Sequence, residues 1–342
     1  MKLLILTHSE VEQLLPMAEC VAVMGEALSA LARGEATQPL RTIFKPDKVK
    51  GVLAMMPAYR SAGTSAPSVT RGLLPGDSPM FGLKAICVFP GNAAAGLDAH
   101  QGGVMLFDGT TGVPLALVNA SAITAIRTAA VSALATSSLA SEDAGQLAII
   151  GAGVQARTHL SAMACVRPIK HVRIASGRFD NAQKFAKEMQ PQFPFLIEPV
   201  ETAEAAVRGA NLIVTATTAR EPVVLRNWIS PGAHINAIGT FSSTAREIDT
   251  ATMAAATLFC DARVSVLNEA GDYLLAAKEG AIGPDHIRAE LGEVLIKKHP
   301  GRTSPDEITL FKSLGLAIED LAAAACVYRK AKQETAGTWV EF

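Results

Sequence analysis

Residues 147–156 read LAIIGAGVQA, and this stretch decides the class of fold. A short apolar run that ends in G-x-G-x-x-A is typical of the turn between a buried strand and a helix. Gly151 permits the tight turn, and Gly153 lets the backbone approach a pyrophosphate at the helix N-terminus, where Val154 and Gln155 follow. We therefore expect these four residues to bind a dinucleotide. The alternative is a glycine-rich turn that serves packing alone.

Downstream of this turn, short apolar runs alternate with helical segments. Strands are expected over residues 147–150, 171–175, 212–215, 234–238 and 257–260, with helices over 156–166, 181–189 and 203–208. This alternation predicts an α/β fold with a doubly wound parallel sheet of the Rossmann type. A last helix is expected from about Ser304 through Lys332.

Upstream of the turn, the pattern indicates a second, α+β domain with a mostly antiparallel sheet. Four β-like runs are separated by Gly, Pro and Asn, over residues 52–56, 83–89, 104–107 and 115–118. A helix is expected after Pro16 and ends at Gly34, and a small-residue helix is expected over 124–139. Ser9 and Glu12 have the spacing of a capping box.

Composition excludes several classes of protein. The 342 residues carry 31 Lys+Arg against 32 Asp+Glu, a net charge of -1, which gives no electrostatic case for nucleic acid or an anionic membrane. The hydrophobic fraction of 49% excludes disorder, and no apolar run was expected to be long enough to span a membrane. The five cysteines are scattered, so neither a disulfide framework nor a metal site is expected. We expect a cytoplasmic protein of two domains.

The end of the second predicted strand bears on the choice of cofactor. An acidic residue about 20 positions after the glycine motif would grip the ribose 2′-hydroxyl of NAD. Here that region holds Ser176 and Arg178, and the first carboxylate is Asp180, which is expected to cap the next helix. Ser176 and Arg178 suit a 2′-phosphate, so NADP(H) is favoured over NAD(H). A solvated surface role is the alternative for Arg178.

Further motifs, together with the glycine turn, resemble the ornithine cyclodeaminase/mu-crystallin family over about residues 10–332. They are MPAY at 56–59, FPGN at 89–92, TAIRTAA at 124–130, HINAIG at 234–239 and DEITLFKS at 306–313. The resemblance implies a homodimer that uses NAD(P)(H) on amino acids and their imines. It also implies a substrate-binding and dimerisation domain formed by residues 1–126 and 314–342, and a Rossmann domain over 127–313.

By resemblance, the substrate carboxylate is held by Arg41, Lys84 and Arg127. The residues agree with this assignment. Lys84 lies inside an apolar run, where a lone ammonium group is costly without an anion nearby. The guanidinium of Arg127 suits bidentate binding of a carboxylate. Lys84 is also the candidate proton donor, because neighbouring arginines would lower its pKa. Ordinary surface or salt-bridged roles are the alternatives.

The predicted cofactor-binding set has four further members: Thr128, Thr215, Gly239 and Ser313. Thr128 is expected near the start of a helical turn, whose N–H groups would contact the cofactor phosphates, as the resemblance implies. His100 and Gln101 are weighed as pocket residues, with a structural role as the alternative.

Two features depart from the family pattern. The cyclodeaminase and a related alanine dehydrogenase carry an aspartate two residues after the glycine that ends the HINAIG segment, and this chain has Phe241 there. A phenyl ring cannot exchange protons. The segment between Tyr59 and Gly82, which is rich in Gly, Ser and Pro, is also longer than expected. It is interpreted as a lid or specificity loop, or as a surface insertion.

Phe241 favours an NAD(P)H-dependent reductase of small, cyclic α-imino acids such as Δ1-pyrroline-2-carboxylate. Three alternatives stay open from the sequence. They are an NAD+-dependent ornithine or lysine cyclodeaminase that releases ammonia, an alanine-type dehydrogenase, and a non-catalytic NADP-binding protein of the crystallin kind. The sequence does not specify the substrate side chain, the ring size or the physiological direction.

Overall fold

The computed structural model describes residues 2–62 and 78–342, which divide into two compact units. The mixed-sheet unit contains Met1–Ala130 and Gly315–Phe342, and the parallel-sheet unit contains Val131–Leu314. The first boundary falls a few residues after the predicted one, inside the unbroken helix α3 (Ala120–Leu139). Most of the predicted long loop lies outside the described residues, and its two ends belong to strands.

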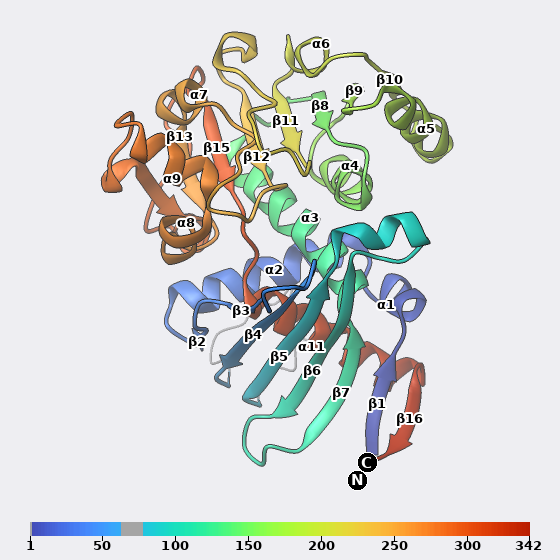
Figure 1. The fold of residues 1–342 in the computed structure, drawn as a ribbon. Coiled ribbons are helices and arrows are strands. Elements are labelled where there is room, and N and C mark those ends of the chain that lie inside the picture. Colours follow the sequence, from blue (N-terminus) through green and yellow to red (C-terminus); the bar gives the residue numbers. More distant parts are fainter. Residues whose placement is uncertain (1, 63–77) are drawn as a thin grey trace. The chain divides into compact units, whose positions relative to one another are not determined.

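The mixed-sheet unit is built on a sheet with the strand order β16-β1-β7-β6-β5-β4-β2, and β3 pairs with β4. The strands are β1 (Lys2–Leu6), β2 (Ala36–Thr37), β3 (Thr42–Phe44), β4 (Val52–Arg60), β5 (Met80–Val88), β6 (His100–Asp108), β7 (Pro114–Asn119) and β16 (Thr338–Glu341). Only β1 and β7 among the described pairs run parallel, so the prediction of a mostly antiparallel sheet is confirmed. The pairing of β1 with β16 brings the chain ends together (Figure 1).

Helix α11 (Ala317–Glu334) covers one face of this sheet. It contacts β4, β5, β6 and β7, and it passes behind them in Figure 1. Because side chains alternate between the faces of a strand, every second residue of β5 is buried against this helix. Lys84 is one of these residues, opposite Met56 on β4 and Val104 on β6. The alternation therefore places an ammonium group under α11.

The N-terminal helices are α1 (His8–Leu14) and α2 (Met17–Ala32). Helix α2 confirms the helix predicted after Pro16. The capping box was predicted two residues too late in the sequence. Glu10 reaches back to the backbone N–H of Thr7 at 2.8 Å, so Thr7 and Glu10 form the box rather than Ser9 and Glu12.

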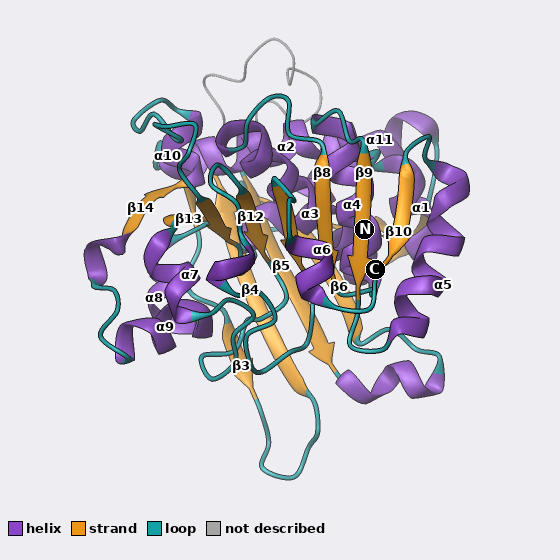
Figure 2. Ribbon diagram, turned by 90° about the horizontal axis from the view of Figure 1, so that it is seen from above, coloured by secondary structure: helices purple, strands orange, loops and turns teal. Residues whose placement is uncertain are grey.

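The parallel-sheet unit has the strand order β10-β9-β8-β11-β12-β15-β13-β14, and all its pairs are parallel. The strands are β8 (Gln146–Ile150), β9 (His171–Ala175), β10 (Leu196–Pro199), β11 (Leu212–Thr215), β12 (His234–Ala237), β13 (Thr257–Cys260), β14 (Ile287–Glu290) and β15 (Thr309–Lys312). The helices are α4 (Val154–Val166), α5 (Phe179–Met189), α6 (Ala203–Val207), α7 (Thr250–Ala255), α8 (Arg263–Glu269), α9 (Gly271–Lys278) and α10 (Leu291–Leu295). Figure 2 shows α4, α5 and α6 beside β8, β9 and β10, as expected of a Rossmann-type unit.

The prediction of one helix from Ser304 through Lys332 is wrong in its first half. Residues Thr309–Lys312 form the fully buried strand β15, between β12 and β13. The chain then turns at Gly315, which has a φ of +78°, before α11 begins at Ala317. A buried run of four residues has too few positions for periodicity to separate a strand from a helix. The cap assigned to Asp180 is also wrong, because Arg178 precedes the first residue of α5.

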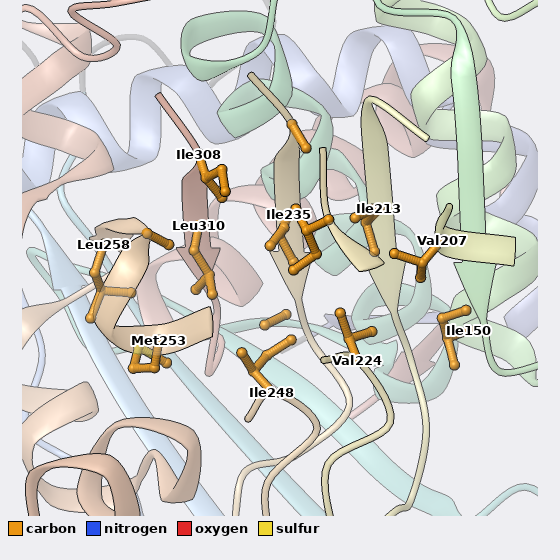
Figure 3. Close-up of a cluster of buried hydrophobic side chains, with 14 of the residues drawn as sticks. Ile150, Val207, Ile213, Val224, Ile235, Ile248, Met253, Leu258, Ile308 and Leu310 are labelled. Atoms are coloured by element: carbon orange, nitrogen blue, oxygen red, sulfur yellow. The ribbon is translucent and has the colours of Figure 1, made fainter. Parts of the chain in front are cut away.

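Aliphatic side chains form the core of the parallel-sheet unit. Figure 3 shows Ile150, Ile213, Ile235 and Leu310, from four neighbouring strands, in one buried cluster with residues of the flanking segments. Full burial of such a side chain stabilises the fold by roughly 1.5–3 kcal/mol. The cluster makes the sheet a rigid base for the loops at the carboxyl ends of its strands.

Helix α3 has its apolar residues interrupted by Arg127 and by several Ser and Thr, so it is not the continuous apolar run that the sequence analysis excluded. By length and composition it could cross a membrane, but 78% of its most apolar window is buried inside the protein. Helices α1 and α2 pass the same test only as a pair, with a bend of 84° between them. Burial of this extent is a property of core helices.

Candidate functional site

A cavity of about 710 Å³ lies at the carboxyl ends of β8, β9 and β11 in the parallel-sheet unit. Strand β8 is the first strand of this unit. Strands β9 and β10 lie on one side of it in the sheet, and β11 and β12 lie on the other side. Such a switch point at the carboxyl ends of parallel strands is where this class of sheet binds ligands. Among the described residues, the lining is Ile150, Gly151, Ala152, Gly153, Arg157, Ala175, Ser176, Gly177, Asn181, Lys184, Ala203, Ala216, Thr217, Thr218, Ala219 and Val223.

The two glycines of the motif have different physical roles. Gly151 has a φ of +113°, and a Cβ there would lie 2.3 Å from the carbonyl oxygen of Ala216. Gly153 has an ordinary φ of −84°, and nothing lies within 4 Å of the Cβ position. The chain fold therefore requires the first glycine, whereas the second leaves space at the start of α4. Val154, the first residue of α4, is 58% exposed, and Gln155 is half-buried.

The residues predicted to select the cofactor lie in different places. Ser176 lines the cavity, while Arg178 is exposed and is not among the lining residues. Sequence reasoning missed two lining cations, Arg157 on α4 and Lys184 on α5. Arg157 forms an ion pair of 2.7 Å with Glu188, and its guanidinium lies 5.3 Å from the ring centre of Phe185. Of the described lining residues, none is acidic.

The other predicted cofactor residues take supporting positions. Thr215 is fully buried, and its hydroxyl donates to Glu247 at 2.9 Å. Glu247 also accepts from the backbone N–H groups of Gly239 and Thr217, both at 2.7 Å. These bonds fix the loops that follow β11 and β12, so Thr215 and Gly239 act beneath the cavity rather than in its lining.

Ser313 and Thr128 likewise lie outside the cavity lining. The buried hydroxyl of Ser313 donates to Asp261 at 3.3 Å. Thr128 is buried in the middle of α3, which begins at Ala120. Its N–H therefore belongs to a helix interior, and the expectation of a helix start at this position is wrong.

A buried cluster of charges occupies the covered face of the mixed sheet. Lys84 is 2% exposed, and its Nζ donates to Oδ1 of Asp320 at 2.9 Å and to Oγ1 of Thr124 at 3.1 Å. Oδ2 of Asp320 is also 2.9 Å from Nζ, in ion-pair contact. Asp320 belongs to α11 and Thr124 to α3, so two helices hold the ammonium group of β5.

Arg127 joins the same cluster from α3. Its Nε donates to Oδ1 of Asp320 at 2.9 Å, and its Nη1 donates to Oε2 of Glu319 at 3.0 Å. A Cβ on Gly315 would lie 2.5 Å from Nη1 of Arg127, so the residue that passes the guanidinium is one without a side chain. The carbonyl oxygen of Gly315 also accepts from Nη2 of Arg41 at 3.0 Å. The structure thus brings together all three predicted carboxylate-binding residues.

Glu319 and Asp320 were missed by the sequence interpretation. A signal existed, because both stand in the apolar stretch LAIEDLA at 316–322, the same kind of context that singled out Lys84. A carboxylate in such a segment needs a partner of opposite charge.

Burial is the largest cause that lowers the pKa of Lys84, to about 8. Asp320 opposes this shift, while Arg127 and Arg41 add to it. The predicted direction of the pKa shift of Lys84 is therefore right, but burial outweighs the arginines as its cause.

The pKa of His100 is also lowered, first by burial and then by Lys84 and Arg127, so His100 on β6 faces the cluster as a neutral ring. Gln101 instead donates to the carbonyl of Asp98 at 3.0 Å.

Phe241, the residue that departs from the family pattern, lies in the loop after β12 and is 50% exposed. The nearby acids Glu247 and Asp272 are buried and bonded to the backbone of this loop region. The loop therefore exposes an aromatic side chain, while the carboxylates of Glu247 and of Asp272 on α9 are bonded to backbone N–H groups.

The fold and the two sites define a class: an α/β protein with a Rossmann-type dinucleotide cavity and a buried cluster of cations suited to a carboxylate. The family model described as the ornithine cyclodeaminase/mu-crystallin family matches residues 1–335. The chain belongs to this family.

Named relatives agree with this assignment. The ketimine reductase mu-crystallin of Mus musculus is 37% identical over 295 residues, which cover 86% of this chain and 85% of that protein. The structure of Thermococcus litoralis Δ1-pyrroline-2-carboxylate reductase in complex with NADH and L-proline has a TM-score of 0.91 at 40% identity, covering 98% and 99% of the two chains. An archaeal alanine dehydrogenase dimer with bound NAD has a TM-score of 0.90 at 33% identity, with full coverage of both chains (100% each).

Proposed function

We propose that the protein is an NAD(P)H-dependent reductase of small, cyclic α-imino acids such as Δ1-pyrroline-2-carboxylate. The observation that carries the proposal is the cluster of the buried Lys84 and Arg127 with the half-buried Arg41, in a chain that also holds a dinucleotide cavity. The reductase relative binds L-proline, which is the product expected from reduction of that cyclic imine. The exposed Phe241 supports reduction over ammonia release, since it supplies no acid at that position.

Each group in the cluster has a role in this reaction. The guanidinium groups of Arg127 and Arg41 and the ammonium of Lys84 would hold the substrate carboxylate, because charge-assisted hydrogen bonds are the strong ones. A bound nicotinamide would supply the hydride that reduces the C=N bond at the imine carbon. The nitrogen then needs one proton, and Lys84 would donate it from Nζ. The protein contributes orientation and charge matching.

The function is tested by following the absorbance of NADPH and NADH with Δ1-pyrroline-2-carboxylate and Δ1-piperideine-2-carboxylate. We expect cofactor oxidation that depends on the imine and yields proline or pipecolate. Ammonia release from ornithine with NAD+, without net change in the cofactor, would instead establish the cyclodeaminase alternative. Oxidation of alanine with release of ammonia would establish the dehydrogenase, and silence in every assay would favour a binding role.

We further propose that NADPH is preferred over NADH. Ser176 follows β9 in the cavity lining, and the cations Arg157 and Lys184 line it as well. Both lie within ion-pair distance of Glu188, which is not a lining residue, and no described lining residue is acidic. A 2′-phosphate has partners in such a lining, and a 2′-hydroxyl lacks the carboxylate that usually grips it. The same assay gives the result as the ratio of kcat/KM for the two cofactors, and a higher value for NADH would contradict this preference.

We also propose a homodimer formed through the open face of the mixed sheet. Phe44 on β3 is 59% exposed and Phe81 on β5 is 47% exposed, and alternation along the strands places both rings on the face opposite to α11. The rings of Tyr59 and Phe81 lie 4.7 Å apart on adjacent strands. Large exposed apolar patches mark interaction sites, and the archaeal relative is a dimer. Light scattering should give a mass of twice 35.7 kDa, and the mass of one chain would contradict the proposal.

A further inference from the structure

One carboxylate joins two cations of the proposed substrate site. Oδ1 of Asp320 accepts from Nζ of Lys84 and from Nε of Arg127, both at 2.9 Å. Asp320 is 1% exposed, so water does not screen these contacts. The two cations come from different elements, β5 and α3, and Asp320 comes from a third, α11.

We propose that Asp320 is a positioning residue for the proposed reduction: it fixes the Nζ of Lys84 beside the guanidinium of Arg127 and keeps that nitrogen charged. The inference rests on the proposed function, since it assigns Lys84 as the proton donor. Asp320 acts through Lys84 and Arg127, and its own carboxylate oxygens are already engaged with them.

The neighbouring acid, Glu319, has a different role. Its Oε2 accepts from Nη1 of Arg127 at 3.0 Å and from the backbone N–H of Leu316 at 3.1 Å. Glu319 therefore ties Arg127 to the start of α11 and has no described contact with Lys84. This difference makes Glu319 a matched control for Asp320, because both are buried acids of one helix that bind the same arginine.

The surroundings of Lys84 determine the direction of the expected effect. On α11, Asp320 contacts Lys84 and Glu319 lies next to Asp320. On α3, Thr124 contacts Lys84 and Arg127 lies near it. Arg41, from the segment before β3, and the neutral His100, from β6, complete the surroundings. Asp320 is the anion that raises the pKa of Lys84 against burial and the two arginines. Without it, Lys84 loses its proton at a lower pH.

The decisive variant is Asp320→Asn, which keeps the shape and removes the charge. In the unchanged protein, the lowered pKa of Lys84 puts the expected alkaline fall of kcat/KM for imine reduction near pH 8. In Asp320→Asn we expect this fall to move down by about one pH unit or more. The same substrate is used throughout, so its own titration is common to all variants. The ¹³Cε resonance of Lys84 in lysine-labelled protein, assigned with Lys84→Arg, should show the same shift without turnover.

Glu319→Gln should raise KM and leave the alkaline fall in place, because the bonds it weakens go to Arg127 and to the N–H of Leu316, not to Lys84. A pH profile and a Lys84 titration that are both unmoved in Asp320→Asn would overturn the proposal, as would an equal shift in Glu319→Gln.

If Asp320→Asn does not fold, Asp320→Glu keeps the charge but displaces it by about one carbon–carbon bond. Its kcat should fall about tenfold or more with the alkaline fall retained, and an unchanged kcat would overturn the proposal. A wild-type protein without imine reduction would instead refute the proposed function, while the Lys84 resonance would still report on Asp320.

Discussion

Replacing Lys84 by methionine should lower kcat for imine reduction by about a hundredfold or more, in the range typical for loss of a general acid. Methionine matches the length of the lysine stem but cannot supply a proton or bind a carboxylate. Because Nζ is buried between Asp320 and Thr124, bulk solvent cannot readily replace it at this position. Stopped-flow measurement of a single turnover with saturating imine would report the chemical step directly.

A control is needed because this change leaves Asp320 with one cation fewer, and breaking a buried ion pair costs about 3–5 kcal/mol of stability. The double variant Lys84→Met with Asp320→Asn removes both charges and leaves Arg127 paired with Glu319, so it should restore part of the stability without restoring turnover. Binding of NADPH should persist in both variants, since the cavity belongs to the parallel-sheet unit. If Lys84→Met keeps kcat and only raises KM, then Lys84 anchors the carboxylate and another group donates the proton.

Replacing Gly153 by alanine should raise the Kd for the dinucleotide by about a hundredfold or more, while the thermal midpoint stays within a few degrees. The Cβ meets no protein atom within 4 Å, so the fold accepts it. The methyl group would instead stand where the backbone must approach the pyrophosphate. Calorimetric titration with NADPH and a thermal scan without cofactor separate the two effects.

The matched variant is Gly151→Ala, which should damage the fold as well as binding. Its Cβ would meet the carbonyl oxygen of Ala216 at 2.3 Å, and the φ of +113° is strained for any residue with a side chain. We expect a clear drop in the thermal midpoint without cofactor. Tight NADPH binding by Gly153→Ala would show that the pyrophosphate does not approach this glycine.

Local patterns in the sequence account for much of the fold. The glycine turn at residues 150–153 and the four-residue strands β11 and β12 were identified because each has a short apolar run followed by small or polar residues. Strand β15 was mistaken for helix because β12 and β13, the strands that pair with it on either edge, are remote in the chain. Tertiary context of this kind has no local signature.

In the candidate site too, residues with a local signature could be predicted from the sequence, whereas their distant partners could not. Lys84 and Arg127 stand out because a charge in an apolar segment needs an explanation. Their partner Asp320 is separated from Lys84 by 236 positions, and no spacing rule connects residues so far apart. Thr215 and Ser313 were assigned to the cofactor, but the structure commits their hydroxyls to buried acids. Both residues stand at the carboxyl end of a strand, which is the edge of the sheet where the cavity lies. The direction in which each hydroxyl points depends on packing.

The late position of α11 in the chain has a consequence for folding during synthesis. All of Val131–Leu314 leaves the ribosome before α11 and β16 do, so the parallel-sheet unit can fold while the mixed-sheet unit, begun first, is still incomplete. Until Asp320 emerges, Lys84 and Arg127 lack the carboxylate they share, and their charges keep the covered face of the sheet hydrated. The unit whose synthesis starts first is therefore the one whose interior closes last.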